Sequence, residues 1–116
     1  MPAEDRPLKS STRGFNPEYG EEAPTLDQVS ELAQDAILEF GAPWCGHCKA
    51  AMPAMREALR AHPDITHIKV YDGKGKPLGR AFGVKQWPTV IRLHDGLETA
   101  RLVRPTATGD ILALLG

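Results

Sequence analysis

The chain has 116 residues, of which 41% are hydrophobic and 25% are charged, and its formal net charge is −1. These values are typical of one compact domain; they exclude a disordered or fibrous chain, and the length leaves no room for a second core. The first 35 residues carry a net charge of −5 and the remaining 81 carry +4. Because the basic residues are neither numerous nor clustered, the charge argues against nucleic-acid binding.

No stretch of the chain approaches the ~18 consecutive apolar residues of a membrane-spanning helix. The N-terminus, Met-Pro-Ala-Glu-Asp-Arg, lacks the basic start and the apolar core of a secretion signal. These features predict a cytoplasmic protein that does not bind membranes, and we expect it to work as a monomer.

The first quarter of the chain is divided by its composition. Residues 1–24 are rich in proline, glycine, serine and charge, and they predict a flexible lead in which Phe15 and Tyr19 could anchor a short edge strand. Apolar residues at helical spacing then predict a first helix over 25–35, with Thr25 as its N-cap. The folded domain is therefore expected to begin at Thr25 and to run to the C-terminus.

The middle of the chain alternates between strand and helix patterns. A mostly apolar run over 36–40 predicts a buried parallel strand. Strong helix formers predict a helix over 49–61, which Pro53 should kink and in which Met52 belongs to the apolar stripe. Alternating residues over 66–71 predict a second strand.

The last third of the chain predicts a short helix, a hairpin and a final helix. The short helix is expected over 78–82, and two strands over 89–93 and 99–103 are joined through an Asp-Gly turn at 95–96. Thr108 can cap a helix that runs to the C-terminus. Strands and helices alternate first and the hairpin comes last, which indicates an α/β domain.

Cys45 and Cys48 are the only cysteines, and they stand at the predicted junction of a strand and a helix. Separated by two residues, they cannot crosslink distant parts of the chain. Cys45 would lie at the helix N-terminus, where unpaired backbone N–H groups and the macrodipole favour a thiolate. Cys48 would lie one turn further on, close enough to form a disulfide with Cys45. The pair therefore predicts thiol–disulfide exchange, in which Cys45 attacks a substrate disulfide and Cys48 resolves the mixed disulfide.

Two close cysteines could also form half of a zinc site. The chain has no second pair, however, and His62, His67 and His94 show no ligand spacing. We therefore expect no metal ion.

Residues 40–49, Phe-Gly-Ala-Pro-Trp-Cys-Gly-His-Cys-Lys, resemble the active-site segment of the thioredoxin family, and Cys-Gly-His-Cys is the variant typical of protein disulfide isomerase domains. Prolines stand five and forty positions after the second cysteine, at Pro53 and Pro88, and Gly96 lies in the final hairpin turn, all at family spacing. The resemblance covers roughly residues 25–116. It implies one thioredoxin-fold domain, with a central mixed sheet flanked by helices and a C-terminal hairpin and helix.

The resemblance also implies roles for particular residues. Cys45 matches the nucleophile and Cys48 the resolving thiol, so the redox-active pair replaces any separate cofactor. Pro88 matches the family's cis-proline, which faces the cysteines. Glu39 stands where thioredoxins carry a buried acid under the second cysteine, and Lys69 matches the lysine beside that acid.

Two interpretations of Glu39 remain open. Burial in an apolar strand should hold the carboxyl partly protonated, so that it could exchange a proton with Cys48 directly or through water. Alternatively, Glu39 could do no more than form an ion pair with Lys69.

The resemblance implies that the substrate surface around the cysteines contains four residues: Trp44, Gly46, Trp87 and Pro88. We expect a cis Trp87–Pro88 bond, with the amide and carbonyl of Trp87 free to pair with a substrate strand. Three residues depart from ordinary thioredoxins. His47 replaces a proline, Trp87 a smaller residue, and Arg104 lies where a glycine is usual near the groove.

We therefore predict a thiol–disulfide oxidoreductase of cell redox homeostasis that acts as a reductase on protein disulfides and receives electrons from a thioredoxin-reductase-type donor. The alternative enzyme is a disulfide oxidase or isomerase. His47 favours this alternative, and the absence of a secretion signal opposes it. An adaptor that docks partners through Trp44, Trp87 and Pro88 without turnover is the alternative outside the enzymes.

Overall fold

A five-stranded mixed sheet organises the chain, with strand order β1-β3-β2-β4-β5. The computed structural model describes residues 8–116. Strands β2 and β3 are parallel, and the other neighbouring strands are antiparallel. The elements in chain order are β1 (Ser11–Arg13), α1 (Leu26–Ser30), β2 (Ala36–Gly41), α2 (Gly46–Arg60), β3 (Thr66–Tyr71), α3 (Pro77–Ala81), β4 (Thr89–His94), β5 (Leu97–Val103) and α4 (Thr108–Leu115).

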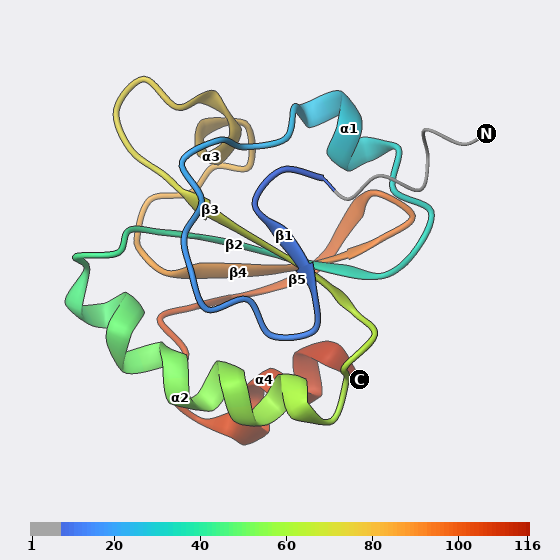
Figure 1. Ribbon diagram of the computed structural model, residues 1–116, viewed down its shortest axis with the longest axis vertical. Helices are drawn as coiled ribbons and strands as arrows, with labels where there is room; N and C mark the ends of the chain where they lie inside the picture. Colours follow the sequence, from blue (N-terminus) through green and yellow to red (C-terminus); the bar gives the residue numbers. More distant parts are fainter. Residues whose placement is uncertain (1–7) are drawn as a thin grey trace.

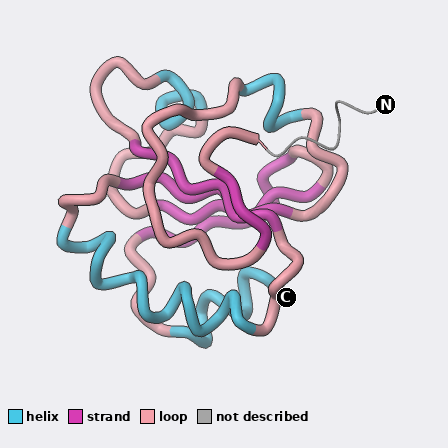
Figure 2. The backbone as a smooth tube through the Cα atoms, in the orientation of Figure 1, coloured by secondary structure: helices cyan, strands magenta, loops and turns pink. Residues whose placement is uncertain are grey.

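Helices cover both faces of the sheet, as Figure 1 and Figure 2 show, with α2 and α4 below it and α1 and α3 above it. Side chains of the central strand β2 alternate between the two layers. Leu38 and Phe40 join the core under α1 and α3, whereas Ile37 joins the core formed by α2 and α4. Glu39 therefore faces α2, the helix that carries the cysteines. The predicted α/β thioredoxin fold is confirmed.

The segment before residue 25 belongs to the folded domain, so the prediction of a flexible lead over 1–24 is wrong for residues 8–24. β1 pairs with β3, and Gly20 forms a further bridge to Val70. Asn16 is buried between them, and its side chain donates to the carbonyl of Ser10 at 3.0 Å. These backbone bonds protect the edge of the sheet, which composition alone did not reveal. Residues 1–7 lie outside the described part.

The first helix is shorter than predicted. Thr25 caps it as expected, since its hydroxyl accepts the N–H of Gln28 and the Gln28 side chain accepts the N–H of Thr25. The helix ends at Ser30 instead of residue 35. Val29 is its one buried side chain, and packing of a single side chain does not stabilise a longer helix.

Two smaller differences concern the later helices. α2 begins at Gly46, three residues before the predicted start, and Met52 is only half-buried where a core position was predicted. Ala107 is the N-cap of α4 and makes no side-chain cap, so the predicted cap at Thr108 is wrong. The hairpin turn is confirmed: φ is 51° at Asp95 and 77° at Gly96, the left-handed geometry of an Asp-Gly turn. No helix within residues 8–116 is both long enough and apolar enough to cross a membrane.

Candidate active site

Cys45 lies immediately before α2, in the loop that follows the carboxyl end of β2. It is the N-cap residue of the helix, and its Sγ accepts the backbone N–H of Cys48 at 3.3 Å. Both cysteines are free thiols, with 8% of Cys45 and 2% of Cys48 exposed. The strand therefore delivers Cys45 to the positive end of the helix dipole, and Cys48 sits behind it.

Cys48 is held as a thiol. Burial and the hydrogen bond with Cys45 raise its pKa to about 11, although a backbone contact from Ala42 and the Tyr19 hydroxyl oppose that shift. Attack by Cys48 on a disulfide therefore requires a group that removes its proton at neutral pH.

Gly41, the last residue of β2, leaves room for two groups to meet. A Cβ at this position would lie 2.6 Å from Cys48 Sγ and 2.6 Å from the Tyr19 hydroxyl oxygen. Tyr19 also packs against the cluster that contains both cysteines. The absence of a side chain at Gly41 thus permits the Tyr19 hydroxyl to reach Cys48.

Glu39 lies in β2 on the face toward α2, with only 2% of its surface exposed. One carboxylate oxygen bonds to His67 Nε2 at 2.8 Å, and the other accepts the Tyr19 hydroxyl proton at 2.5 Å. His67 Nδ1 accepts the backbone N–H of Asn16 at 2.9 Å, so Nε2 must carry the ring proton and donate it to Glu39. Both carboxylate oxygens are therefore satisfied by donors.

The prediction that burial keeps Glu39 partly protonated is wrong. Burial does raise the pKa of this carboxyl, but the hydrogen bond from His67, the charge of Lys69 and the Tyr19 hydroxyl oppose it, and the pKa lies below its usual value. Glu39 is consequently a carboxylate at neutral pH.

Lys69 does not form the predicted contact ion pair with Glu39, although the two residues are register partners in β2 and β3. Its ammonium donates to the carbonyl of Pro17 at 3.3 Å and lies 4.4 Å from the centre of the Tyr19 ring. Burial lowers the pKa of Lys69, while the charge of Glu39 opposes this shift. Lys69 therefore supports the carboxylate from a distance and holds the tyrosine ring in place.

Two indole rings border Cys45 on the exposed side of the site. Trp44 is 63% exposed and donates to the Tyr71 hydroxyl at 2.9 Å, and Trp87 donates to Asp72 Oδ2 at 2.9 Å. The two rings pack edge to face with centroids 5.6 Å apart. These contacts fix both indoles beside the nucleophile.

The loop before β4 and the end of β5 complete this side. The Trp87–Pro88 peptide bond is cis. Arg104 has a φ of 54°, its N–H donates to the Pro88 carbonyl at 2.8 Å, and its Nε donates to the Trp87 carbonyl at 2.9 Å. The Trp87 carbonyl is therefore occupied, which corrects the expectation that it is free for a substrate strand.

A groove runs past the nucleophile between the start of α2 and the loops before β4 and after β5. Its lining contains every predicted substrate residue except Pro88, together with His47: Trp44, Cys45, Gly46, His47, Lys85, Gln86, Trp87 and Arg104. Gly46 and His47 are exposed in the first turn of α2, where both border the groove.

Sequence reasoning missed the parts that Tyr19 and His67 play in the site. Tyr19 was expected only to anchor an edge strand, and His67 was considered only as a metal ligand. The signal for His67 was its position two residues before Lys69, since the two side chains share a face of β3 with Glu39 beside them. Tyr19 had no such signal, because it lies outside regular structure.

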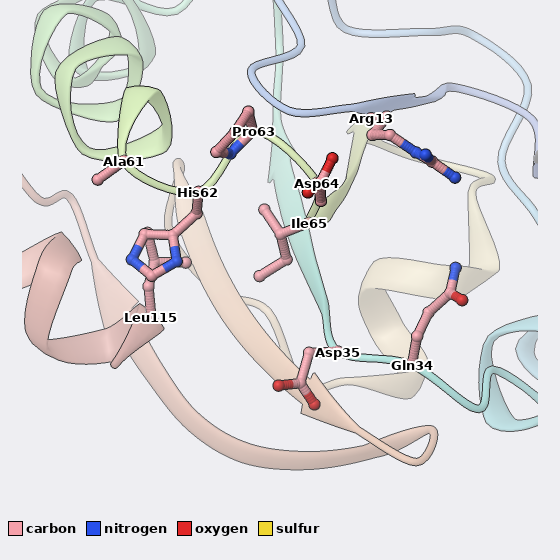
Figure 3. Close-up of a pocket in the computed structure, with 9 residues that line it drawn as sticks. All are labelled: Arg13, Gln34, Asp35, Ala61, His62, Pro63, Asp64, Ile65 and Leu115. Carbon is pink, nitrogen blue, oxygen red and sulfur yellow. The ribbon is translucent and has the colours of Figure 1, made fainter.

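A separate depression lies at the opposite end of the parallel strands, where Asp35 precedes β2 (Figure 3). Arg13, His62 and Asp64 border it, and none of the predicted site residues does. Asp35 is already engaged by Arg92 at 2.9 Å. This depression is therefore distinct from the cysteine site.

The family model described as thioredoxin matches residues 22–115. The chain is similar to the reduced form of thioredoxin 2 from Pseudomonas aeruginosa, at 44% identity and a TM-score of 0.78 over 87% of this chain and 94% of that one. It is 40% identical over 74 residues to protein disulfide-isomerase tigA of Aspergillus niger, a match covering 60% of this chain and only 20% of the isomerase. It is also 26% identical over 78 residues to thioredoxin of Mycoplasma genitalium, covering 67% and 76% of the two chains. The match to the family model, over most of the chain, and the active-site geometry agree, and the chain belongs to the thioredoxin family.

Proposed function

We propose that this protein is a thiol–disulfide oxidoreductase that reduces disulfides in protein substrates through Cys45 and Cys48. The observation that carries the proposal is the asymmetry of the pair. Cys45 receives a backbone N–H at the helix N-terminus and borders the groove, whereas Cys48 is buried and held as a thiol. Such a pair suits attack by one cysteine and resolution by the other.

The reaction has two exchange steps. The Cys45 thiolate attacks one sulfur of the substrate disulfide, and the other sulfur leaves with the bonding electron pair and takes a proton from water. Cys48 then loses its proton and attacks Cys45, which releases the second substrate sulfur as a thiolate. The substrate ends reduced and Cys45–Cys48 ends as a disulfide, so each turnover requires two electrons from a donor.

Glu39 is the base of the second step in this proposal. It is ionised, buried and linked to Cys48 through one intervening group, and general-base catalysis of this kind contributes about 10²- to 10⁴-fold. Lys69 supports the carboxylate by its charge. We place no metal ion or separate cofactor in the reaction.

The substrate is bound along the groove beside Cys45. Trp44 and Trp87 offer apolar contact to the residues flanking the target cysteine, and Gly46 leaves room for the substrate chain next to the nucleophile. Pro88 lies directly after Trp87 and carries no backbone donor. The backbone N–H of Trp87 can therefore donate to a substrate strand, and Pro88 offers no second N–H beside it.

A reductase of this kind fits a reducing compartment, and we propose a cytoplasmic monomer that is recycled by a donor of the thioredoxin reductase type. The second candidate is a disulfide oxidase or isomerase. The Cys-Gly-His-Cys motif and the 40% identity to a protein disulfide-isomerase favour it. The reduction potential of the Cys45–Cys48 couple decides the direction, since a value well below that of the glutathione pool supports the reductase.

Reduction of insulin by dithiothreitol tests the activity. The wild-type protein should accelerate the precipitation of insulin chains, and a variant with both Cys45→Ser and Cys48→Ser should not. An adaptor without turnover would instead leave the insulin rate unchanged, and it would bind its partners equally well after loss of both cysteines.

A further inference from the structure

We propose that the Tyr19 hydroxyl carries the proton from Cys48 to Glu39 when the mixed disulfide is resolved, a role that rests on the proposed oxidoreductase function. Tyr19 joins the two groups: its hydroxyl donates to Glu39 at 2.5 Å, and its side chain packs against the cluster that contains Cys48, where Gly41 leaves room for the hydroxyl oxygen and for Cys48 Sγ. A direct transfer would require Glu39 to leave the hydrogen bonds that hold it.

The hydrogen-bond inventory sets the direction of each bond. A phenol has one proton, and Tyr19 gives it to Glu39. Toward Cys48 the Tyr19 oxygen can therefore only accept, and the Cys48 thiol is the donor that fits. After the proton has moved, the same hydroxyl can donate to sulfur, which is the contact that opposes the rise in the pKa of Cys48.

The transfer balances without any further reactant. Cys48 gives its proton to the Tyr19 oxygen while Tyr19 gives its own proton to Glu39. The electron pair left on the Cys48 sulfur forms the bond to Cys45, and the bond between Cys45 and the substrate sulfur breaks. That bonding pair leaves with the substrate sulfur, which takes a proton from water.

The surroundings of Tyr19 keep it neutral throughout. Burial, the negative charge of Glu39 and the contact with Cys48 all raise the pKa of the phenol. The charged and titratable groups around this network are Glu39 on β2, His67 and Lys69 on β3, Cys48 and Arg56 on α2, and Glu18 in the N-terminal segment. Because the phenol does not ionise, it passes a proton on without storing one.

Tyr19→Phe tests this role, because it removes the hydroxyl and keeps the ring over Lys69. The matched control is Thr12→Val, which removes a hydroxyl from the same N-terminal segment, where it donates to the Gly14 carbonyl. The substrate is an aromatic disulfide. It releases one coloured thiol when Cys45 attacks it and a second when Cys48 resolves the mixed disulfide. The two coloured bursts then report attack by Cys45 and resolution by Cys48 separately.

We expect Tyr19→Phe to leave the first burst unchanged and to slow the second by about 10²-fold at pH 7. The deficit should shrink as the pH approaches the Cys48 pKa of about 11, where the thiol ionises without help. Thr12→Val should slow neither burst. Combining Tyr19→Phe with Glu39→Gln should slow resolution no more than the slower single variant.

An unchanged second burst in folded Tyr19→Phe protein would overturn the relay, and so would a deficit that persists at high pH. Absence of both bursts in the wild-type protein would instead overturn the proposed function. Thermal unfolding of each variant identifies a loss of fold. In that case the solvent isotope effect on the second burst of the wild-type protein decides: its dependence on the D2O fraction should be quadratic for the relay, in which two protons move, and a linear dependence, expected for direct transfer of one proton, would overturn the relay.

A second, independent observation concerns the charge of the groove. From it we infer that the groove selects substrate segments that carry a carboxylate beside the target cysteine, which also rests on the proposed function. Lys85, Arg104 and His47 line the groove, and none of its lining residues is acidic. The nearby carboxylate of Asp72 is already bonded to the Trp87 indole.

Arg104 is positioned to provide this selection. Its left-handed backbone is fixed by the bond to Pro88, and its Nε holds the Trp87 carbonyl. A substrate strand that takes this carbonyl with its own N–H displaces the guanidinium into the groove. A carboxylate on the substrate then offers the guanidinium a charged, two-pronged partner.

Disulfide-linked peptides that differ only in one residue beside the cysteine, Glu, Gln or Lys, test the selection. We expect kcat/KM for the Glu peptide to exceed that for the Lys peptide by about 5-fold at low salt, and the ratio to fall toward one in high salt. Arg104→Gln should reduce the ratio. Arg80→Gln, which removes an equal charge from α3, should not.

A wild-type ratio near one would overturn the inference, and so would equal losses in Arg104→Gln and Arg80→Gln. Failure to reduce any of the three peptides would instead count against the proposed function, because it would remove turnover rather than selection.

Discussion

The two sides of the cysteine pair differ in nearly every physical property. The side facing Cys45 is an open groove walled by two indoles and bordered by basic side chains. The side behind Cys48 is the more closed one: Cys48 and Glu39 are each 2% exposed, and the phenol and the imidazole both donate to the acid, although a pocket lined by Tyr19, Cys48 and Met52 opens beside them. One cysteine is thus prepared to meet a substrate and the other to lose a proton. Variants on either side should therefore affect different steps.

The largest effect is expected from the cysteines themselves. Cys45→Ser should lose disulfide reduction by about 10³-fold or more, because no other thiol lines the groove. Cys48→Ser should accumulate mixed disulfides through Cys45, because resolution is lost. Non-reducing gels of each variant incubated with a disulfide substrate measure the trapping, and equal trapping by both variants would contradict the division of labour.

Glu39→Gln should slow resolution by about 10²-fold at neutral pH, because the base of the second step is removed. Attack by Cys45 should keep its wild-type rate. Single-turnover kinetics separate the two steps, with Glu57→Gln as the control for loss of an exposed carboxylate on α2. Slower attack in Glu39→Gln would show that the closed side also governs the nucleophile.

The same substitution should change the acid limb of the stability curve. Because the folded pKa of Glu39 lies below its usual value of 4.5, its ionisation stabilises the fold above that pH, and this contribution is lost as the pH falls through the folded pKa. Urea unfolding at pH 7 should find Glu39→Gln less stable by about 2 kcal/mol, since two hydrogen bonds to a charge are weakened. The gap should narrow at pH 3, and a constant gap would argue against a buried carboxylate.

His47→Pro should lower the reduction potential of the couple by about 30 mV. An imidazole beside the Cys45 sulfur stabilises the thiolate and hence the reduced form, and 30 mV corresponds to about a tenfold change in the equilibrium. Equilibration with glutathione measures the potential. The control is His62→Gln. His62 lies after the end of α2 and does not line the groove, so its loss should leave the potential unchanged.

The smallest effect is expected from Trp87→Thr, a change confined to the open side. Loss of the indole removes the contact with Trp44 and the bond to Asp72, so the groove should accept a wider range of protein disulfides by a few fold. The rate with a small disulfide should barely change. A panel of protein and small substrates measures both, and equal changes in the two classes would contradict a role in specificity.

The open side was the easier half to predict. Trp44, Gly46, His47 and Cys45 are neighbours in the chain, and a strand that runs into a helix places them at one helix end whatever surrounds them. The closed side gathers Tyr19, Glu39 and His67 from three separate segments. Their partnership depends on which strands pair and in which register, and neither is encoded locally.

The charge state of Glu39 shows the limit most clearly. The sequence predicted that Glu39 is a buried acid, and only 2% of its surface is exposed. Its ionisation, however, was predicted from burial alone, and the hydrogen bonds from His67 and Tyr19 reversed the result. The occupied Trp87 carbonyl is a similar case, because the guanidinium that occupies it arrives from the far end of β5.

The sequence by itself determined the family, the cysteine chemistry, the order of the elements after residue 25 and the hairpin turn, because periodicity, capping residues and motif spacing act over a few residues. Only the tertiary structure decided the ordered N-terminal edge, the bond between Arg104 and Trp87, and the network that joins Tyr19, Glu39 and His67. Hydrogen-bond partners and pKa shifts depend on groups within a few ångströms in space, and in this fold those groups lie as many as 59 positions apart along the chain, as Asp35 and His94 do.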